Sequence, residues 1–301
     1  MDAKHLLIVG VLASLVITFS GCTLPWQSEE KEAPVVTQVP NEGIIIEYFG
    51  PSESYIIGGQ DVKIRVRVRN VGGAVGSVKE IKWPQSIYEI FEGTISLPTL
   101  PSECKNLNPP NPDKKQEGGY CEVEVKGTTK TVTSTKTYSG EGFKIRVKYN
   151  YTTEAKVSIP VYSTSIVNKK RRDGTLPSSK PMTENTYAPI KLEYGNAPYF
   201  EATGSSKTYE AYIFVRNEGS GDLAVDKFGR QKVNKITVTT PVTWASIDDS
   251  ECRGGVTLQE GRCTIKITLK NNAPEDGVLP LSIKAEYEYV TQKSSSITIR
   301  P

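Results

Sequence analysis

Apolar and polar residues alternate with a period of two in several stretches of the chain. In "DVKIRVRVRN" (61–70), Val and Ile occupy every second position and Lys and Arg fill most of the positions between them. "FKIRVKYNY" (143–151) and "LSIKAEYEY" (281–289) repeat this alternation. A strand with one buried side and one solvent-facing side has this period. Each stretch is therefore predicted to be a half-buried antiparallel β-strand.

The start of the chain has a different pattern, because residues 6–19 (LLIVGVLASLVITF) are apolar without interruption and follow Lys4. As a helix this run spans about 21 Å, which is less than the ~30 Å hydrocarbon core of a bilayer. It therefore favours a signal peptide over a permanent transmembrane helix. The small residues Ser20 and Gly21 then precede Cys22.

The stretch "FSGC" resembles the lipobox of exported lipoproteins, in which cleavage occurs before a cysteine that becomes lipid-modified. Phe19 stands where that pattern usually has Leu. The resemblance implies a signal peptide at 1–21 and a lipid anchor on Cys22; the alternative is an unmodified cysteine after an ordinary signal peptide. Residues 22–42 are rich in Pro, Glu and Gln and have no helical or strand period, so a flexible tether is predicted.

Two parts of the chain share landmarks in the same order. Each copy has a long strand ending in an Asn-x-Gly motif, then a Ser-Glu-Cys triplet, a strand that begins with Cys, and a strand with two tyrosines. The matching segments are VRNVGG (68–73) with VRNEGS (215–220), SEC (102–104) with SEC (250–252), CEVEV (121–125) with CTIKI (263–267), and KYNYTT (148–153) with EYEYVT (286–291). Each Asn-x-Gly is expected to form a turn that needs a positive φ.

These landmarks predict two homologous domains, 43–163 and 188–301, joined by a polar linker at 164–187. Several alternating strands per domain, separated by Gly, Pro and Asn, are typical of a β-sandwich. A strand entering VRNVGG or VRNEGS resembles the immunoglobulin-like modules of archaeal and bacterial surface proteins, including the CARDB domain and S-layer-associated modules. The resemblance implies an all-β fold of two tandem immunoglobulin-like sandwiches and a surface location, with an archaeal source favoured; it implies no activity.

The cysteines fit an exported protein. The chain has five, so one cannot pair within it, and lipidation of Cys22 leaves four. Because each copy has one Ser-Glu-Cys cysteine and one cysteine that opens a strand, the expected disulfides are Cys104–Cys121 and Cys252–Cys263. The alternative is four free thiols, which export disfavours.

Composition excludes several kinds of chemistry. The only histidine is His5, inside the predicted signal, so the mature chain has no histidine for a triad or a zinc site. The formal net charge of +3 is too small to indicate a nucleic-acid partner. No cofactor, no metal site and no catalytic residue is predicted.

Several features have two interpretations each. Trp83 and Trp244 lie beside prolines at similar places in the copies and either stack on a sugar or close the core. "DDSE" (248–251) either binds Ca²⁺ or forms a solvated acidic turn. The basic run "NKKRR" (168–172) either contacts anionic lipid or an acidic polymer, or belongs to a solvated linker. In each pair the second interpretation is favoured.

The outward faces of the long strands offer further candidates. The row Lys63, Arg65, Arg67 and Arg69 either binds an anion or is neutralised by cross-strand carboxylates such as those of Glu122 and Glu124. Asn150 opens the triplet Asn-Tyr-Thr, which is a possible glycosylation site.

The second copy differs from the first on this face. Aligning the two VRN motifs places Tyr212 and Phe214 where the first copy has Arg65 and Arg67. Large aromatic side chains on a solvent-facing side need cover. Tyr212 and Phe214 are therefore hypothesised to form an interface with the first domain, with the linker or with another protein.

The expected function is that of a lipoprotein anchored on the extracytoplasmic side of the cell membrane. It is not expected to be an enzyme but to serve in adhesion, scaffolding or envelope assembly, with another envelope protein or a surface polysaccharide as partner. The alternative is a carbohydrate-binding accessory module, or a glycoside hydrolase of the envelope that uses a carboxylate pair. No such pair stands out in the sequence, and domain duplication suits a spacer or binder better.

Overall fold

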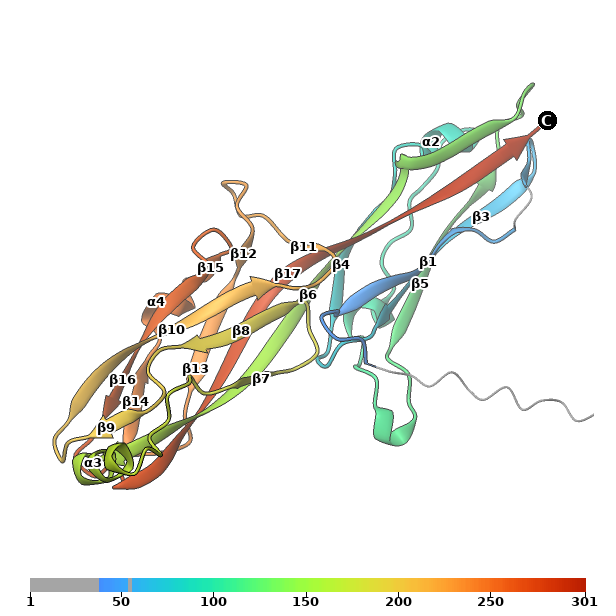
Figure 1. The fold of residues 1–301 in the computed structure, drawn as a ribbon. Helices are drawn as coiled ribbons and strands as arrows, with labels where there is room; N and C mark the ends of the chain where they lie inside the picture. Colours follow the sequence, from blue (N-terminus) through green and yellow to red (C-terminus); the bar gives the residue numbers. More distant parts are fainter. Residues whose placement is uncertain (1–37, 54–55) are drawn as a thin grey trace, which may run out of the picture. The chain divides into compact units, whose positions relative to one another are not determined.

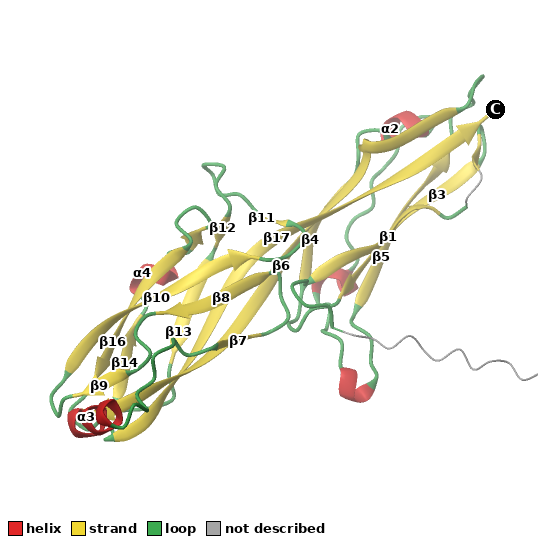
Figure 2. Ribbon diagram, viewed as in Figure 1, coloured by secondary structure: helices red, strands yellow, loops and turns green. Residues whose placement is uncertain are grey.

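The computed structural model describes residues 38–53 and 56–301. The predicted signal peptide, Cys22 and most of the predicted tether lie outside the described residues. Strands dominate the described part, as Figure 2 shows, and the predicted all-β fold is confirmed. Within the described residues, no helix is long and apolar enough to cross a membrane.

The first group of strands forms a sandwich that we call the N-terminal sandwich. One sheet has the strand order β1-β3-β5. The facing layer belongs to a larger sheet and contains β4, the first half of β6 and the last part of β17. The bounds are β1 Ile44–Pro51, β2 Ile56–Ile57, β3 Asp61–Asn70, β4 Ser77–Lys82, β5 Tyr120–Thr128 and β6 Lys136–Ser163, with α2 at Ile87–Ile90 and the 3₁₀ helices η1 at Ser102–Lys105 and η2 at Pro112–Lys114.

The second group forms the C-terminal sandwich. One sheet has the order β14-β16-β10-β8, and the facing layer contains β13, the first part of β17 and the second half of β6. The bounds are β7 Thr183–Asn185, β8 Ile190–Gly195, β9 Phe200–Ala202, β10 Lys207–Asn217, β11 Asp222–Leu223, β12 Lys232–Val233, β13 Lys235–Thr239, β14 Ala245–Asp248, β15 Val256–Thr257, β16 Arg262–Leu269 and β17 Asp276–Arg300, with α3 at Thr164–Arg172 and α4 at Ser250–Arg253.

The alternation read from the sequence matches the burial of the strands. In β3, Val62, Ile64, Val66 and Val68 are buried, while the residues between them are exposed or half-buried. Apolar residues at every second position thus fill the space between the two sheets, which is the expected origin of the core.

Strands β6 and β17 pass through both sandwiches (Figure 1). They pair antiparallel from Tyr162↔Asp276 at one end to Lys136↔Ile299 at the other, with one register shift between Ser294 and Ser296. In the C-terminal sandwich the end of β6 pairs with β7 and β9, while in the N-terminal sandwich the end of β17 pairs with β2. Each sandwich therefore contains a strand end from the other half of the chain, and the predicted count of two domains is not confirmed.

The register of this pair relates the two copies to each other. Asn150 lies opposite Glu288, and Tyr149 and Tyr151 lie opposite Tyr289 and Tyr287. The matching segments KYNYTT and EYEYVT thus face one another across the two strands. In each of β6 and β17, the residues before this midpoint lie in the sandwich of their own copy. The residues after it lie in the sandwich of the other copy.

Both predicted disulfides are confirmed. Cys104 in η1 bonds to Cys121 in β5, with Cα atoms 5.2 Å apart, and Cys252 in α4 bonds to Cys263 in β16, with Cα atoms 5.3 Å apart. Each bond fastens a short helix to a later strand of its own copy, η1 to β5 and α4 to β16.

The segment 164–187 is more ordered than its polar composition predicts. It contains α3, which includes the basic run 168–172, and β7. The Ser163 side chain accepts a hydrogen bond from the Ile166 backbone N–H at 3.4 Å, and Val167 is buried. A cap and a single apolar anchor are enough for a short helix that packs on the end of β6, although they leave no visible period in the sequence.

Candidate interaction surfaces and the central polar clusters

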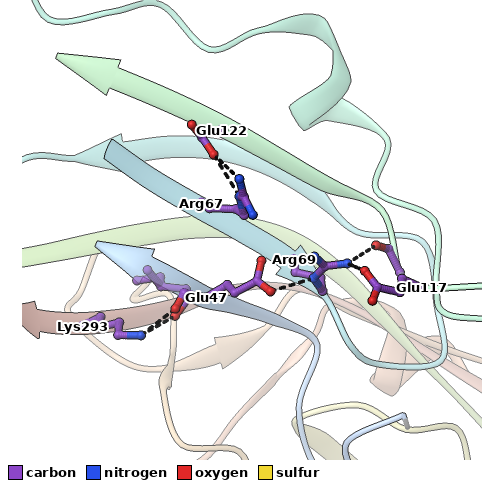
Figure 3. Close-up of polar contacts among 8 residues, drawn as sticks. Glu47, Arg67, Arg69, Glu117, Glu122 and Lys293 are labelled. Atoms are coloured by element: carbon purple, nitrogen blue, oxygen red, sulfur yellow. Dashed lines mark hydrogen bonds and ion pairs between the residues drawn. The ribbon is translucent and has the colours of Figure 1, made fainter. Parts of the chain in front are cut away.

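The outer face of β3 carries a row of three arginines that we call the arginine row: Arg65, Arg67 and Arg69. Glu122 on β5 lies opposite Arg67. Its carboxylate accepts from Arg67 Nε at 2.9 Å (Figure 3). It also lies 3.4 Å from Arg65 Nη1, so one carboxylate joins two guanidinium groups. The hydrogen bond that Arg67 donates to Glu122 raises the pKa of Arg67 above its ordinary value.

Arg69 completes the row with two further carboxylates. Its Nε lies 3.2 Å from Glu47 Oε1 on β1, and its Nη1 donates to Glu117, as Figure 3 shows. The exposed ring of Tyr120 lies beside Arg67 and Arg69, with guanidinium carbons 5.2 and 5.3 Å from its centroid. The arginine row is therefore neutralised by nearby carboxylates and is not an open anion site.

The face of β10 that corresponds to the arginine row carries Tyr212 and Phe214. Both side chains are half-buried, with ring centroids 6.5 Å apart. Phe214 covers Gly195 on β8, where an added Cβ would lie 2.1 Å from Phe214 Cε2, and the Arg262 guanidinium lies 4.6 Å from the Tyr212 centroid. Neighbouring strands of the same sheet thus provide part of the cover that was expected for these two aromatic rings. Whether these two residues also form an interface stays a prediction.

A buried polar cluster forms around Asn70 at the end of β3. Asn70 Nδ2 donates to Ala74 O at 2.7 Å and to Leu107 O at 2.8 Å. Its Oδ1 accepts from Gly72 N and from the Tyr151 hydroxyl, both at 3.1 Å, and that hydroxyl accepts from Ala74 N at 3.2 Å. We call this group the Asn70 cluster. It ties the loop after β3 to strand β6.

The same arrangement recurs around Asn217 at the end of β10. Asn217 Nδ2 donates to Gly221 O at 2.9 Å, and its Oδ1 accepts from Gly219 N at 3.2 Å and from the Tyr289 hydroxyl at 2.8 Å. Gly221 N donates to Tyr289 Oη at 3.0 Å. This Asn217 cluster reproduces four hydrogen bonds of the Asn70 cluster, residue for residue in the aligned copies.

The role of the Asn-x-Gly motif differs from the expected one. Gly72 and Gly219 are not among the residues with a positive φ, so the predicted left-handed turn is wrong. A Cβ on Gly72 would lie 2.2 Å from the Tyr151 hydroxyl oxygen, and one on Gly219 would lie 2.5 Å from that of Tyr289. Glycine is needed for close approach of the tyrosine. The sequence contained both partners, Asn-x-Gly and Tyr-x-Tyr, but gave no sign that they meet.

The tyrosines of both clusters belong to a buried group at the middle of β6 and β17. Tyr149, Tyr151, Tyr287 and Tyr289 are all at most 2% exposed. Burial raises the pKa of Tyr151 to about 12, and it raises the pKa values of Tyr149, Tyr287 and Tyr289 as well. All four hydroxyls are therefore neutral under ordinary conditions.

Lys293 connects the end of β17 to the opposite layer. Its Nζ donates to the carbonyl oxygens of Ile46 at 3.2 Å and Glu47 at 2.8 Å on β1 (Figure 3). A strand end from the second copy thus holds the edge of a sheet made by the first. An edge carbonyl capped by a lysine is also protected from pairing with another chain.

The remaining aromatic and acidic candidates have structural roles. Trp83 is buried at 9% exposure, and Trp244 packs against the core. Asp249 is buried; its carboxylate accepts from Val238 N at 2.9 Å and from Arg253 Nε at 2.6 Å. Glu251 accepts from Thr264 N at 3.1 Å. These carboxylates position α4, and the described residues contain no cluster of three or more acidic, histidine or cysteine side chains suited to a metal ion.

Asn150 and the basic helix lie on the surface of the shared strands. Asn150 is half-buried in β6, between Ser77 of β4 and Glu288 of β17. Its modification stays a prediction. Lys169, Arg171 and Arg172 of α3 are exposed, while Lys170 Nζ lies 4.7 Å from the ring centroid of Tyr162.

Neither a protein-family model nor a curated protein matches this sequence.

Proposed function

We propose that the chain is a lipid-anchored, extracytoplasmic scaffold or adhesion module that acts by holding surfaces at fixed positions and not by catalysis. The lipobox-like stretch before Cys22 supports the anchor. The predicted partner is another envelope protein or a surface polysaccharide.

The pairing of β6 with β17 is the observation that supports a scaffold most directly. A flexible linker would let two surface modules move independently, whereas two paired strands resist bending and separation. Here both connections between the sandwiches lie in one continuous ladder, and the Asn70 and Asn217 clusters fasten its middle. Such a construction keeps binding surfaces on both sandwiches in a constant relation.

Replacement of Cys22 by Ser tests the anchor. The parent is expected in the membrane fraction and Cys22→Ser in the soluble or secreted fraction, because the thioether-linked lipid is lost. A chain with both Cys104→Ser and Cys121→Ser is the matched control, and it is expected to stay with the membrane. Membrane retention of Cys22→Ser at the parent level would contradict the anchor.

Crosslinking in native membranes, followed by affinity capture, tests the scaffold. We expect a stoichiometric envelope protein or polysaccharide to be recovered with the parent chain. Hydrolysis of an envelope polysaccharide by the purified chain would instead support the enzymatic alternative.

A further inference from the structure

The second copy contains a hairpin that the first copy does not have. In the first copy, residues 71–76 connect Asn70 to the next strand, β4. In the second, residues 218–234 connect Asn217 to β13 and include β11 and β12. The hairpin between β11 and β12 extends away from the sheets in Figure 1. Because the first sandwich closes without such a segment, the fold itself does not require it.

The end of this hairpin is a closely hydrogen-bonded turn, Asp226–Arg230. Asp226 Oδ1 accepts from Phe228 N at 2.8 Å and from Arg230 N at 3.0 Å, while Oδ2 accepts from Arg230 Nη2 at 2.9 Å. Backbone bonds from Asp226 N to Arg230 O and from Gly229 N to Asp226 O close the turn, and Gly229 supplies a φ of 77°. The carboxylate is thus hydrogen-bonded within the turn and orders it.

This turn exposes apolar side chains that no other described part of the chain covers. Phe228 is 69% exposed and Val225, at the base of the turn, is 62% exposed. Lys227 Nζ and Arg230 Cζ lie 5.0 and 5.2 Å from the Phe228 ring centroid. Exposure of an aromatic ring to water is unfavourable. An ordered loop that places such a ring between two cations is therefore a candidate binding surface.

The chemistry of the turn matches the boundary between lipid headgroups and acyl chains. An aromatic ring enters that boundary readily, and flanking Lys and Arg side chains bind anionic phosphates at the same depth. The one acidic group of the turn, Asp226, is paired with Arg230, so the turn keeps one net positive charge beside the ring.

The exit of the tether is placed so that a membrane can be reached. The Glu42 carboxylate accepts from Ser220 N at 3.1 Å, so the described chain begins beside the base of the hairpin. The segment between Cys22 and Gln38 spans up to roughly 50 Å when extended, which lets anchor and turn meet one bilayer.

We propose that the Asp226–Arg230 turn inserts Phe228 into the headgroup region of an anionic lipid bilayer and gives the anchored chain a second membrane contact. The proposal rests on the proposed membrane anchoring. A second contact would orient the sandwiches relative to the membrane, which a flexible tether alone does not do.

Fluorescence quenching by brominated lipids tests the insertion. The full chain is reconstituted in vesicles of brominated phosphatidylcholine with brominated phosphatidylglycerol, and Phe228→Trp is compared with Met182→Trp after subtraction of the parent signal. Met182 is the matched control because it is 78% exposed and lies outside the hairpin. We expect at least twofold stronger quenching at position 228, reduced when phosphatidylglycerol is omitted or salt is raised.

The outcomes separate this proposal from the anchor. A chain that floats with vesicles but shows equal, weak quenching at 228 and 182 overturns the insertion and leaves the anchor intact. Quenching at 228 in a chain whose Cys22 carries no lipid by mass spectrometry supports the insertion and overturns the anchor. Crosslinking of residue 228 to a protein in native membranes, without quenching in lipid vesicles, also overturns the insertion.

Discussion

The N-terminal and C-terminal sandwiches share a polar cluster, a disulfide and a strand exchange, but they differ in how much of the cluster is buried. Asn70 is fully buried and uses both amide hydrogens, one of them on Leu107 O. Asn217 is half-buried, and its amide donates to Gly221 O. Leu107 lies between Cys104 and Cys121, which are 17 residues apart, whereas Cys252 and Cys263 are 11 apart. The longer loop of the first copy covers its asparagine.

The outer faces differ in a second way. The first copy pairs arginines with carboxylates across its strands, and the second places Phe214 over Gly195. Ion pairs at a surface are weak because water and salt screen them, whereas a ring that covers a glycine removes apolar area from water. Equivalent positions in the two copies therefore contribute differently to stability.

The largest expected effect comes from separating the two copies at the predicted boundary. A fragment of residues 188–301 lacks the end of β6, which lies between β17 and the short strands β7 and β9. We expect no cooperative thermal transition from this fragment, because its facing layer loses a central strand. Co-expression with residues 38–187 is the control and is expected to restore a single transition. Cooperative unfolding of 188–301 alone would show that the exchange is dispensable.

Alkaline pH should destabilise the centre where the copies meet. Tyrosines of the unfolded chain ionise near pH 10, whereas burial raises the pKa of Tyr151 to about 12. The folded chain then binds more protons above pH 10, so stability is complete below pH 10 and is lost as the pH rises toward 12. Tyr151 alone accounts for about 3 kcal/mol, and the other buried tyrosines add to it.

Urea denaturation at pH 8 and pH 11 measures this loss. Tyr151→Phe and Tyr289→Phe are each expected to reduce the difference between the two pH values. The exposed Tyr88 provides the control, and Tyr88→Phe should leave the difference unchanged. A pH dependence that neither buried variant alters would contradict the assignment to this group.

Alanine at the two asparagines compares the clusters directly. Asn70→Ala leaves four backbone or hydroxyl groups without their partner, three of them buried, and we expect a loss of about 3–4 kcal/mol in the free energy of unfolding. Asn217→Ala is expected to cost about 1–2 kcal/mol, because water reaches part of that cluster. Equilibrium urea unfolding measures both values. Equal losses would mean that the Leu107 contact contributes nothing.

The smallest expected effects are on the outer faces. The double variant Tyr212→Ser and Phe214→Ser is expected to cost about 2 kcal/mol through lost packing, whereas Arg67→Gln with Glu122→Gln should cost less than about 1 kcal/mol. Thermal unfolding and capture of membrane partners are measured together. Lost partners with unchanged stability would support the interface hypothesis for Tyr212 and Phe214; unchanged partners and stability would contradict both roles.

Local sequence features determined the strands and the covalent bonds. The period of two in 61–70, 143–151 and 281–289 predicted which side chains are buried, because alternation follows from the pleat of a strand whatever its partners are. Cys104–Cys121 and Cys252–Cys263 followed from their equivalent places in the two copies. The four pairs of matching segments were also visible without the structure.

Tertiary structure decided how the two copies are connected. The same strand pattern suits β6 and β17 ending in their own sandwich or crossing into the other, because both arrangements bury the same alternate residues. Only the long-range register Asn150↔Glu288, fixed by hydrogen bonds between residues far apart in the chain, selects the exchange. Likewise, the sequence of Asn70 and Gly72 suggested only a turn. Their role in the polar cluster depends on Tyr151, which approaches from a strand far away in the sequence. A polar group without a partner is costly to bury, so the asparagine and the tyrosine need each other.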